Sequence, residues 1–311
     1  MIASQPNIKN HLIFLLSFLA LYFFWAYYLI GFRQDHAIFM LINVVFILSH
    51  RITRKFTLYM VCFIAFMMIY DSMRIYPNYI FNDVATIELY NLEKSMFGIE
   101  YKGQNLTPNE YTNLHLNPIL DIASGIFYLL WVPLPLIFAI YLYFNDKIKL
   151  IELSFVFLFI NLLGFVWYYI YPAAPPWYFA EYGTNIIYGM HGNPGNFINF
   201  DNMVGYPIFQ NMYSKNANVF ASIPSLHAAY PLLTCYYAVK FKTKKFLIAS
   251  IIITLGIWGS AVYSFHHYII DILLGIICVI FALILFEVVI NKEKFKLIIS
   301  RYSKFIETKF H

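Results

Sequence analysis

The run His267-Tyr-Ile-Ile-Asp-Ile-Leu-Leu-Gly-Ile-Ile-Cys-Val-Ile-Phe-Ala-Leu-Ile-Leu-Phe-Glu-Val-Val-Ile290 decides the fold of this protein. It carries few charges and is long enough to cross about 30 Å of hydrocarbon as one helix. A chain crosses lipid only as helices or as a closed barrel, and runs of this length are too long and unbroken for barrel strands. The chain has eight apolar runs, of which the second and third are short for this thickness. Together they predict an all-α, polytopic membrane helix bundle with about eight transmembrane helices. The predicted spans are residues 11–31, 36–50, 55–71, 118–144, 149–171, 225–241, 246–264 and 267–290.

The composition excludes a soluble globular domain. Of the 311 residues, 61% are hydrophobic and 12% are charged, whereas soluble domains are about half apolar and about a quarter charged. We therefore expect one integral membrane domain over residues 1–311. Cys62, Cys235 and Cys278 are scattered through apolar runs, and such an odd set predicts neither a disulfide framework nor a zinc site.

The distribution of charge predicts the orientation in the membrane. Sixteen of the 21 Lys and Arg residues lie near the termini or in short connections that eight spans place on one side. By the positive-inside rule that side is cytoplasmic, so both termini are expected there. Residues 72–117 and 172–224 then lie outside, and the apolar spacing of 86–97 predicts a short helix on the membrane surface. The five external cations are Arg33, Arg74, Lys94, Lys102 and Lys215.

The first chemical motif is Ser222-Ile-Pro-Ser-Leu-His227, at the start of the predicted span 225–241. Proline suits the first helical turn, where its missing N–H would have no partner anyway. His227 is therefore expected beside free backbone N–H groups, which form a natural site for an anion such as phosphate. The alternative is an interfacial histidine that only caps the helix.

The second motif is His266-His-Tyr-Ile-Ile-Asp271. His267 and Asp271 are four residues apart and share one helix face, and a carboxylate inside the membrane needs a partner. Asp271 is expected to bind one ring nitrogen of His267 and leave the other as a nucleophile or base. The alternative is a structural polar pair between helices. His266 faces about 100° away, which favours an interfacial anchor.

These motifs resemble those of the type 2 phosphatidic acid phosphatase superfamily. Ser222–Ala229 resembles the Pro-Ser-x-His signature, Ser260–Gly275 resembles the Ser-Arg-x5-His-x3-Asp signature, and Tyr171-Pro-Ala-Ala-Pro-Pro-Trp-Tyr178 stands where the first signature is expected. Ala261 occupies the arginine position of the third signature. This change and the Ala-Pro-Pro-Trp sequence are similar to the inositol phosphorylceramide synthase branch. The resemblance implies a six-helix catalytic core within 118–290, preceded by extra helices in 1–72.

The resemblance implies a lipid phosphotransferase that works through a phosphohistidine. His267 would be the nucleophile, Asp271 would orient it, and His227 would be the shared acid and base. No metal or cofactor is implied. The expected partners are a phospholipid donor and a lipid alcohol acceptor, with ceramide as the candidate, and no nucleic acid; the oligomeric state stays open. The residues expected to bind substrate are Arg74, Lys215, Ser225, Pro175, Pro176, Trp177 and His266.

Two other functions remain open from the sequence. One is a phosphatase of the same fold that acts on phosphatidate or a polyprenyl diphosphate. The other is a transporter or scaffold with structural histidines, although the polar groups gather at one interface rather than at the midplane that transporters use. The apolar, stiff segment 173–178 favours transfer over hydrolysis, because it would admit a lipid alcohol and exclude water.

The charge asymmetry generates a test of orientation. In intact cells, a Lys215→Cys variant should react with a membrane-impermeant thiol reagent, because 172–224 is expected outside. A Lys242→Cys variant, in a predicted cytoplasmic connection, serves as the matched control and should react only after lysis. The reverse labelling pattern would overturn the orientation and the external active site with it.

Overall fold

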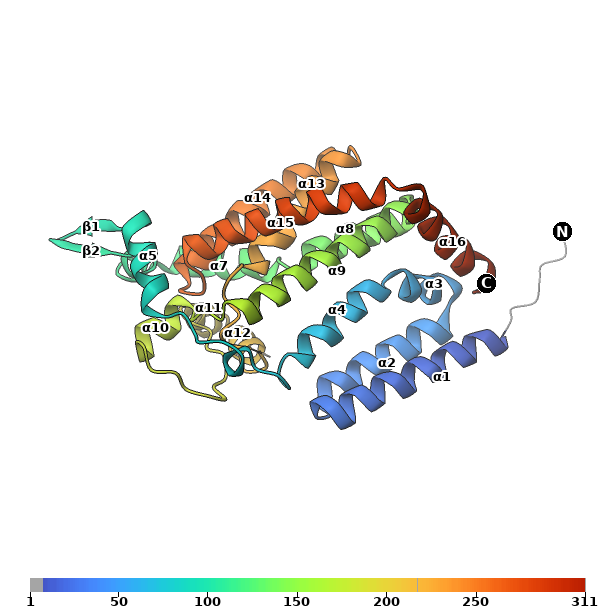
Figure 1. Ribbon diagram of the computed structural model, residues 1–311, viewed down its shortest axis with the longest axis horizontal. Helices are drawn as coiled ribbons and strands as arrows, with labels where there is room; N and C mark the ends of the chain where they lie inside the picture. The colour runs from blue at the N-terminus through green and yellow to red at the C-terminus, as the bar shows by residue number, and fades with distance from the viewer. Residues whose placement is uncertain (1–7, 217, 311) are drawn as a thin grey trace. The chain divides into compact units, whose positions relative to one another are not determined.

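The computed structural model describes residues 8–216 and 218–310, and most of these are helical (Figure 1). Each of the eight predicted spans is helical, which confirms the predicted fold class. Among the described residues, the segments long and apolar enough to cross a membrane alone are Leu12–Ile30, Lys147–Ile170, Lys244–Tyr263 and Ile269–Ile290. Two further helix pairs would each form one bent span. They are Arg51–Tyr59 with Val61–Ser72, bent by 54°, and Pro118–Leu129 with Pro133–Asn145, bent by 41°.

The chain divides into two compact units. The first contains residues 1–75, 139–158 and 284–311, and the second contains 76–138 and 159–283. The first unit holds α1 (Ile8–Phe24) with a π-helical end (Trp25–Ile30), α2 (Gln34–Ser49), α3 (Arg51–Tyr59), α4 (Val61–Ser72), α16 (Glu293–Lys309) and parts of α8 (Pro133–Asn145), α9 (Lys147–Ile170) and α15 (Ile269–Ile290). Figure 1 shows α1 and α2 as neighbouring antiparallel helices.

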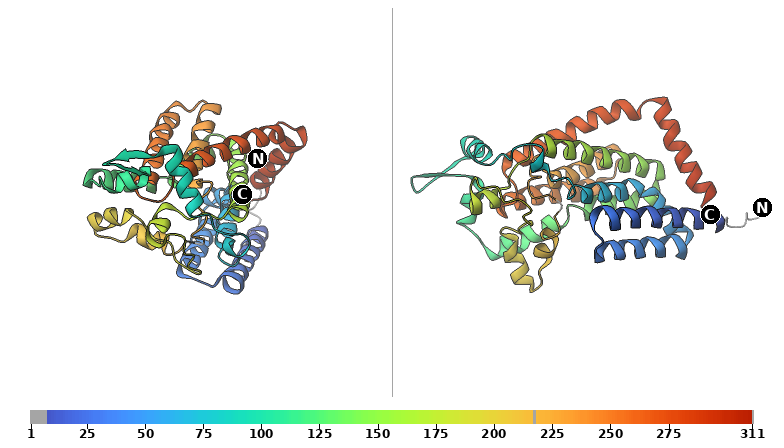
Figure 2. Two further views of the ribbon diagram at one scale, coloured as in Figure 1. Left: turned by 60° about the vertical axis from the view of Figure 1, so that its left-hand side comes forward. Right: turned by 60° about the horizontal axis from the view of Figure 1, so that its bottom comes forward.

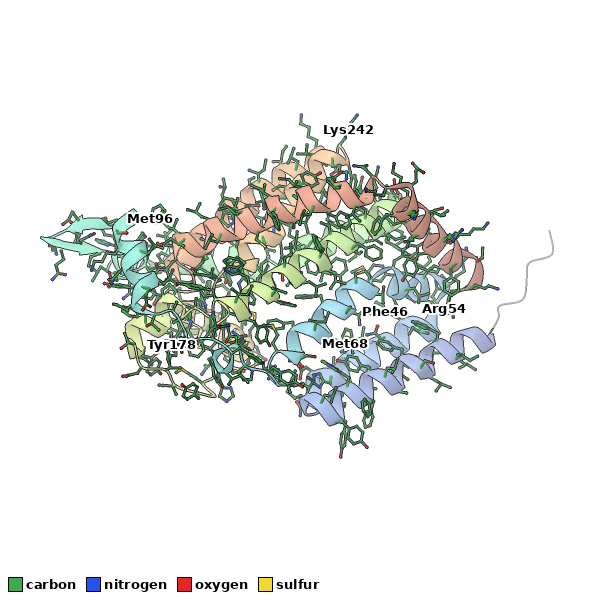
Figure 3. The ribbon with its side chains drawn as sticks, viewed as in Figure 1. Phe46, Arg54, Met68, Met96, Tyr178 and Lys242 are labelled. Carbon is green, nitrogen blue, oxygen red and sulfur yellow. The ribbon has the colours of Figure 1, made fainter. Side chains whose placement is uncertain are left out.

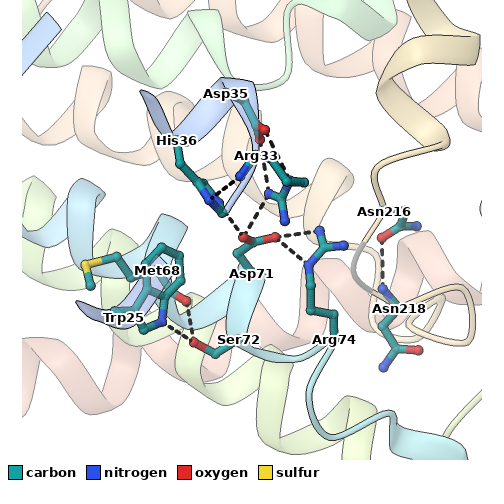
Figure 4. Close-up of polar contacts among 10 residues, drawn as sticks. All are labelled: Trp25, Arg33, Asp35, His36, Met68, Asp71, Ser72, Arg74, Asn216 and Asn218. Carbon is teal, nitrogen blue, oxygen red and sulfur yellow. Dashed lines mark hydrogen bonds and ion pairs between the residues drawn. The ribbon is translucent and has the colours of Figure 1, made fainter. Parts of the chain in front are cut away.

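A buried carboxylate joins the helix ends of the first unit. Asp71, at the end of α4, accepts hydrogen bonds from Arg33 (2.9 Å) and from Arg74 (2.8 and 2.5 Å) and lies 3.0 Å from the His36 ring (Figure 4). Arg33 also pairs with Asp35. Because a buried charge needs partners, this network neutralises Asp71 and at the same time occupies both arginines.

The C-terminal helix is attached to the same unit through Glu307. Its carboxylate pairs with Lys55 of α3 (2.5 Å) and Lys147 of α9 (2.7 Å). Burial acts to raise the pKa of Glu307, but the hydrogen bonds and charges of the two lysines outweigh burial and lower the pKa to about 2. The opposite face of α16 remains exposed and carries both basic and apolar side chains.

The second unit contains the other parts of α8, α9 and α15, including the start of α15, and all remaining elements. They are a 3-10 turn (Asn78–Ile80), α5 (Ile87–Phe97), β1 (Ile99–Tyr101), β2 (Gln104–Leu106), α6 (Pro108–Asn113), α7 (Pro118–Leu129), α10 (Pro176–Tyr182), α11 (Phe197–Val204), α12 (Ile208–Tyr213), α13 (Leu226–Lys240) and α14 (Lys244–Tyr263). The strands form an antiparallel hairpin that pairs Ile99 with Leu106. Figures 1 and 2 show α13 and α14 as a helical hairpin, and Figure 3 shows Lys242 at its tip.

Both long segments that the sequence places outside are folded. The short helix predicted at 86–97 is α5, and α6 begins with a capping box in which Thr107 and Glu110 bind each other's backbone N–H groups. Residues 172–224 contain three short helices rather than an open loop. Ala173 joins these segments, because it forms parallel bridges with both Ala85 and Ala221.

Candidate active site

His227 stands in the first turn of α13, as predicted, but Pro224 precedes the N-cap and is not part of that turn. Ser225 is the N-cap: its fully buried Oγ accepts a hydrogen bond from the Ala228 N–H at 3.3 Å. Such a cap satisfies one of the N–H groups that lack a partner at a helix start. Ser225, which the sequence analysis placed in the substrate site, therefore has a local structural role, and His227 is fixed one residue inside the helix.

His267 lies in the turn between α14 and α15, because α15 begins only at Ile269. The turn is closed by the Ala261 carbonyl, which accepts hydrogen bonds from the His266 and His267 N–H groups, both at 3.0 Å. Phe265 takes the left-handed conformation there, with φ of 67°. Ala261 itself is buried in the core, so the position where the superfamily signature has arginine contributes packing and a carbonyl here.

The three residues expected to act together form one continuous chain of contacts. Nδ1 of His227 lies 3.2 Å from Nε2 of His267, and Nδ1 of His267 lies 3.1 Å from Oδ2 of Asp271. The same Asp271 oxygen accepts hydrogen bonds from Ser222 Oγ (2.6 Å) and the Tyr268 N–H (3.1 Å). An ionised Asp271 only accepts hydrogen bonds, and beside it His267 would carry its proton on Nδ1 and direct the lone pair of Nε2 toward His227.

Burial is graded along this chain. Asp271 is 0% exposed and His267 is 5% exposed, whereas His227 is only half-buried. The His227 ring contacts Trp131, with ring centroids 4.5 Å apart, and Tyr128, at 5.1 Å. The carboxylate is thus kept from water, and His227 is the most exposed of the three residues.

The helices that carry these residues touch through their backbones. The Ser225 N–H donates to the Asp271 carbonyl at 2.9 Å, which ties the start of α13 to α15. One turn further along α15, a Cβ added at Gly275 would meet the Ser225 carbonyl oxygen at 2.4 Å. Only glycine permits this approach, so Gly275 sets how closely the two halves of the site come together.

The segment with Pro175 and Pro176 is fastened to both other motifs. The Trp177 N–H donates to the Phe265 carbonyl, and the Ala173 N–H donates to the Phe220 carbonyl, each at 3.0 Å. Pro175 is the N-cap of α10 and Pro176 is its first residue. Since Pro175, Pro176 and Trp177 are all buried, the structure makes this segment a rigid apolar wall beside the two histidine motifs.

The other residues expected at the substrate site have different surroundings. His266 is buried, lies 2.7 Å from the Pro194 carbonyl oxygen and stacks on Tyr213 with ring centroids 4.2 Å apart, as an anchor would. Burial lowers the pKa of His266 well below its usual range, so the neutral ring donates this bond. Arg74 belongs to the first unit, where it pairs with Asp71, and Lys215 is exposed after α12.

Two buried side chains from the segment before α7 support the His267 turn, and the sequence analysis assigned no role to either. Glu93 of α5 binds the N–H groups of Ile269 and Ile270. Asn109 of α6 donates to the His267 carbonyl at 3.0 Å. The signal for Asn109 was its place directly inside a capping box, but nothing in the amphipathic pattern of 86–97 distinguishes Glu93 from a solvated residue.

Comparison with known proteins places these features in a family. A family model described as the PAP2 superfamily matches residues 102–285. The phosphoinositol dihydroceramide synthase of Bacteroides thetaiotaomicron is 43% identical over 281 residues, which cover 89% of this chain and 92% of that enzyme. The inositol phosphorylceramide synthase of Candida albicans is 31% identical over 173 residues, 51% of this chain and 36% of that enzyme. The corresponding catalytic subunit of Saccharomyces cerevisiae is 34% identical over 122 residues, 38% of this chain and 29% of that protein. No solved structure matches the chain.

The backbone contact at Gly275 predicts a sensitive position. Gly275→Ala should lower the free energy of unfolding by about 1–3 kcal/mol, because the added methyl group overpacks against a backbone carbonyl. The measurement is thermal unfolding of the purified protein in detergent. Gly259→Ala is the matched control, since a Cβ there meets nothing within 4 Å, and it should keep or raise the unfolding temperature. Equal effects of the two substitutions would contradict the close approach of α13 and α15.

Proposed function

Since the chain belongs to the PAP2 superfamily, in its inositol phosphorylceramide synthase-like branch of enzymes that act on membrane lipids, we propose that it transfers a phosphoinositol headgroup from a phospholipid to a ceramide-type alcohol. The observation that carries this proposal is the chain of contacts from His227 through His267 to Asp271. It supplies a nucleophile, a group that orients it and an acid and base, the three parts that two-step transfer requires.

In the first step, Nε2 of His267 attacks phosphorus and the bond from phosphorus to the diacylglycerol oxygen breaks. His227 gives a proton to that oxygen, so diacylglycerol leaves as the neutral alcohol. Asp271 keeps the Nδ1 proton of His267 in place and stabilises the positive charge that develops on the ring. Because the two imidazole rings are in contact at 3.2 Å, they must separate to admit the phosphate group between them.

In the second step, the acceptor hydroxyl attacks phosphorus and the bond from phosphorus to His267 breaks. His227, now neutral, takes the hydroxyl proton and returns the site to its starting state. The products are a ceramide that carries the phosphoinositol group and a free His267. Each residue thus acts twice, and no proton is gained or lost over the cycle.

The donors for the phosphate oxygens must come from groups other than the arginine that Ala261 replaces. A helix start offers N–H groups without intrahelical partners, and the first turn of α13 carries His227 itself. We therefore place the phosphate against the start of α13. Arg74, which the sequence offered as a ligand, belongs to the first unit and is paired with Asp71 there.

The apolar wall favours a lipid acceptor over water. Trp177 and Tyr178 are buried and pack with Phe220 and Phe265, so the segment next to both histidine motifs has little polar surface. A phosphohistidine in such surroundings is protected from hydrolysis until an alcohol arrives. The names of the similar enzymes support ceramide or dihydroceramide as that alcohol.

The proposed roles predict a hierarchy of variants. His267→Ala should reduce turnover to background, and His227→Ala and Asp271→Asn should each reduce it by about 10²–10⁴-fold. The losses should not add in double variants, because the residues act as a unit. Turnover is measured with equal amounts of folded protein, and His191→Ala, an exposed histidine of the same unit, is the control. Near-normal turnover by His267→Ala would remove the phosphohistidine mechanism.

The proposed acceptor predicts the product. Purified protein supplied with headgroup-labelled phosphatidylinositol should form labelled inositol phosphorylceramide and diacylglycerol, at a rate that rises with added ceramide or dihydroceramide. Chromatography of the lipid and aqueous phases measures both products. Label released mainly as free phosphate or inositol phosphate, at a rate unaffected by the acceptor, would instead favour a lipid phosphatase.

A further inference from the structure

Glu93 is a buried acid on an otherwise amphipathic helix. It is 0% exposed, whereas Leu92 and Met96 of the same helix are 48% and 57% exposed. Its Oε1 accepts a hydrogen bond from the Ile269 N–H at 2.9 Å, and its Oε2 accepts one from the Ile270 N–H at 3.1 Å. A carboxylate from α5 therefore binds the first two residues of α15.

These two bonds complete the N-terminus of the helix that follows His267. The His267 N–H binds the Ala261 carbonyl and the Tyr268 N–H binds Asp271, so Glu93 takes the next two N–H groups in order. A carboxylate is favoured at this end of a helix by the helix dipole. The direction in which α15 leaves the catalytic turn thus depends on a residue 176 positions earlier in the chain.

Asn109 holds the same turn from the neighbouring helix α6. Its Nδ2 donates to the His267 carbonyl at 3.0 Å and to the Val262 carbonyl at 2.8 Å. The backbone of the turn is therefore fixed at its carbonyl by Asn109 and at the following N–H groups by Glu93. A loss of either contact would let the His267 ring move relative to His227.

We propose that Glu93 is a positioning residue for the catalytic pair, which aims His267 at His227 by holding the start of α15. The inference rests on the proposed function, because its effect is read out in transfer activity. The hydrogen bonds of the Glu93 carboxylate go to backbone N–H groups of α15, so its effect on His267 passes through the backbone.

The position of Glu93 also makes this contact depend on pH. Burial raises the pKa of Glu93 to about 7, against the two N–H bonds that lower it, and Asp271 raises it further. The titratable groups that interact with Glu93 are Asp271 of α15 and Tyr268 of the preceding turn, and Tyr268 in turn interacts with Tyr90 of α5 and Glu110 of α6. The ionised form accepts both N–H bonds at full strength, whereas protonation turns one oxygen into an O–H donor and weakens it as an acceptor.

Ionisation of Glu93 changes the stability of the fold and the activity in opposite directions. Because the folded pKa lies above the ordinary value of 4.5, the folded protein binds the extra proton between about pH 4.5 and pH 7. Ionisation of Glu93 therefore lowers the stability of the fold as the pH rises through this window. The contact that aims His267 forms over the same window, so activity should rise where stability falls.

The test compares Glu93→Gln with Glu88→Gln, an exposed acid of the same helix. Both variants and His267→Ala are assayed in lipid nanodiscs with phosphatidylinositol and dihydroceramide, at equal amounts of folded protein. Glu93→Gln should lower kcat by about 10–100-fold and leave KM within about threefold, because misplacement of a reacting group lowers the rate more than binding. Glu88→Gln should match the unsubstituted protein.

The pH profile separates positioning from a merely structural role. The ratio of kcat of the unsubstituted protein to that of Glu93→Gln should grow by up to about tenfold from pH 6 to pH 8, as Glu93 ionises. The ratio cancels the titration of the histidines, which both proteins share. A reduced kcat with a ratio that stays constant over this range would overturn the proposal, as would an unchanged kcat.

A second variant keeps the test decisive if Glu93→Gln does not fold. Ile269→Pro removes one of the two N–H donors at the first helical position, where proline is tolerated. It should lower kcat less than Glu93→Gln does, again with little change in KM, and normal kcat would contradict the proposal. His267→Ala tells the two failures apart: activity in that variant overturns the proposed mechanism, whereas its loss with an active Glu93→Gln overturns only the inference.

Discussion

The structure of the site depends on the burial of one carboxylate. Asp271 is 0% exposed, and a charge removed from water needs hydrogen-bond donors around it. The donors come from three places: Ser222 before α13, the Tyr268 N–H at the start of α15, and the His267 ring. The need to satisfy this group brings the two histidine motifs together, and the orientation of His267 follows from it.

Backbone contacts then set the distances between the motifs. The Ser225 N–H binds the Asp271 carbonyl, and the Trp177 N–H binds the Phe265 carbonyl. Main-chain bonds of this kind have little freedom, because both partners belong to folded segments. The segment before α7 adds Glu93 and Asn109, so residues far from the motifs in sequence fix the turn that carries His267.

Charged side chains have different roles in the two units. In the first unit, Asp71 pairs with Arg33 and Arg74, and Glu307 pairs with Lys55 and Lys147, so the described cations nearest these acids serve the fold. In the second unit, Ala261 replaces an arginine and the wall around Trp177 is apolar. A site of this composition offers helix N–H groups and imidazole rings in place of arginine as partners for a phosphate group.

The sequence by itself determined the helical membrane fold, because lipid leaves a chain with such apolar runs few alternatives. The spacing in the sequence also pointed to the partnership of His267 with Asp271, but the structure makes this contact from the turn before α15 and not along one helix face. The orientation in the membrane stays a prediction from charge, as does the division into 1–72 and 118–290. Only the tertiary structure decided that His227 meets His267, that Arg74 belongs to a network with Asp71, and that Glu93 binds the start of α15. Local sequence patterns do not predict these contacts, because each contact joins two segments that are brought together by tertiary packing.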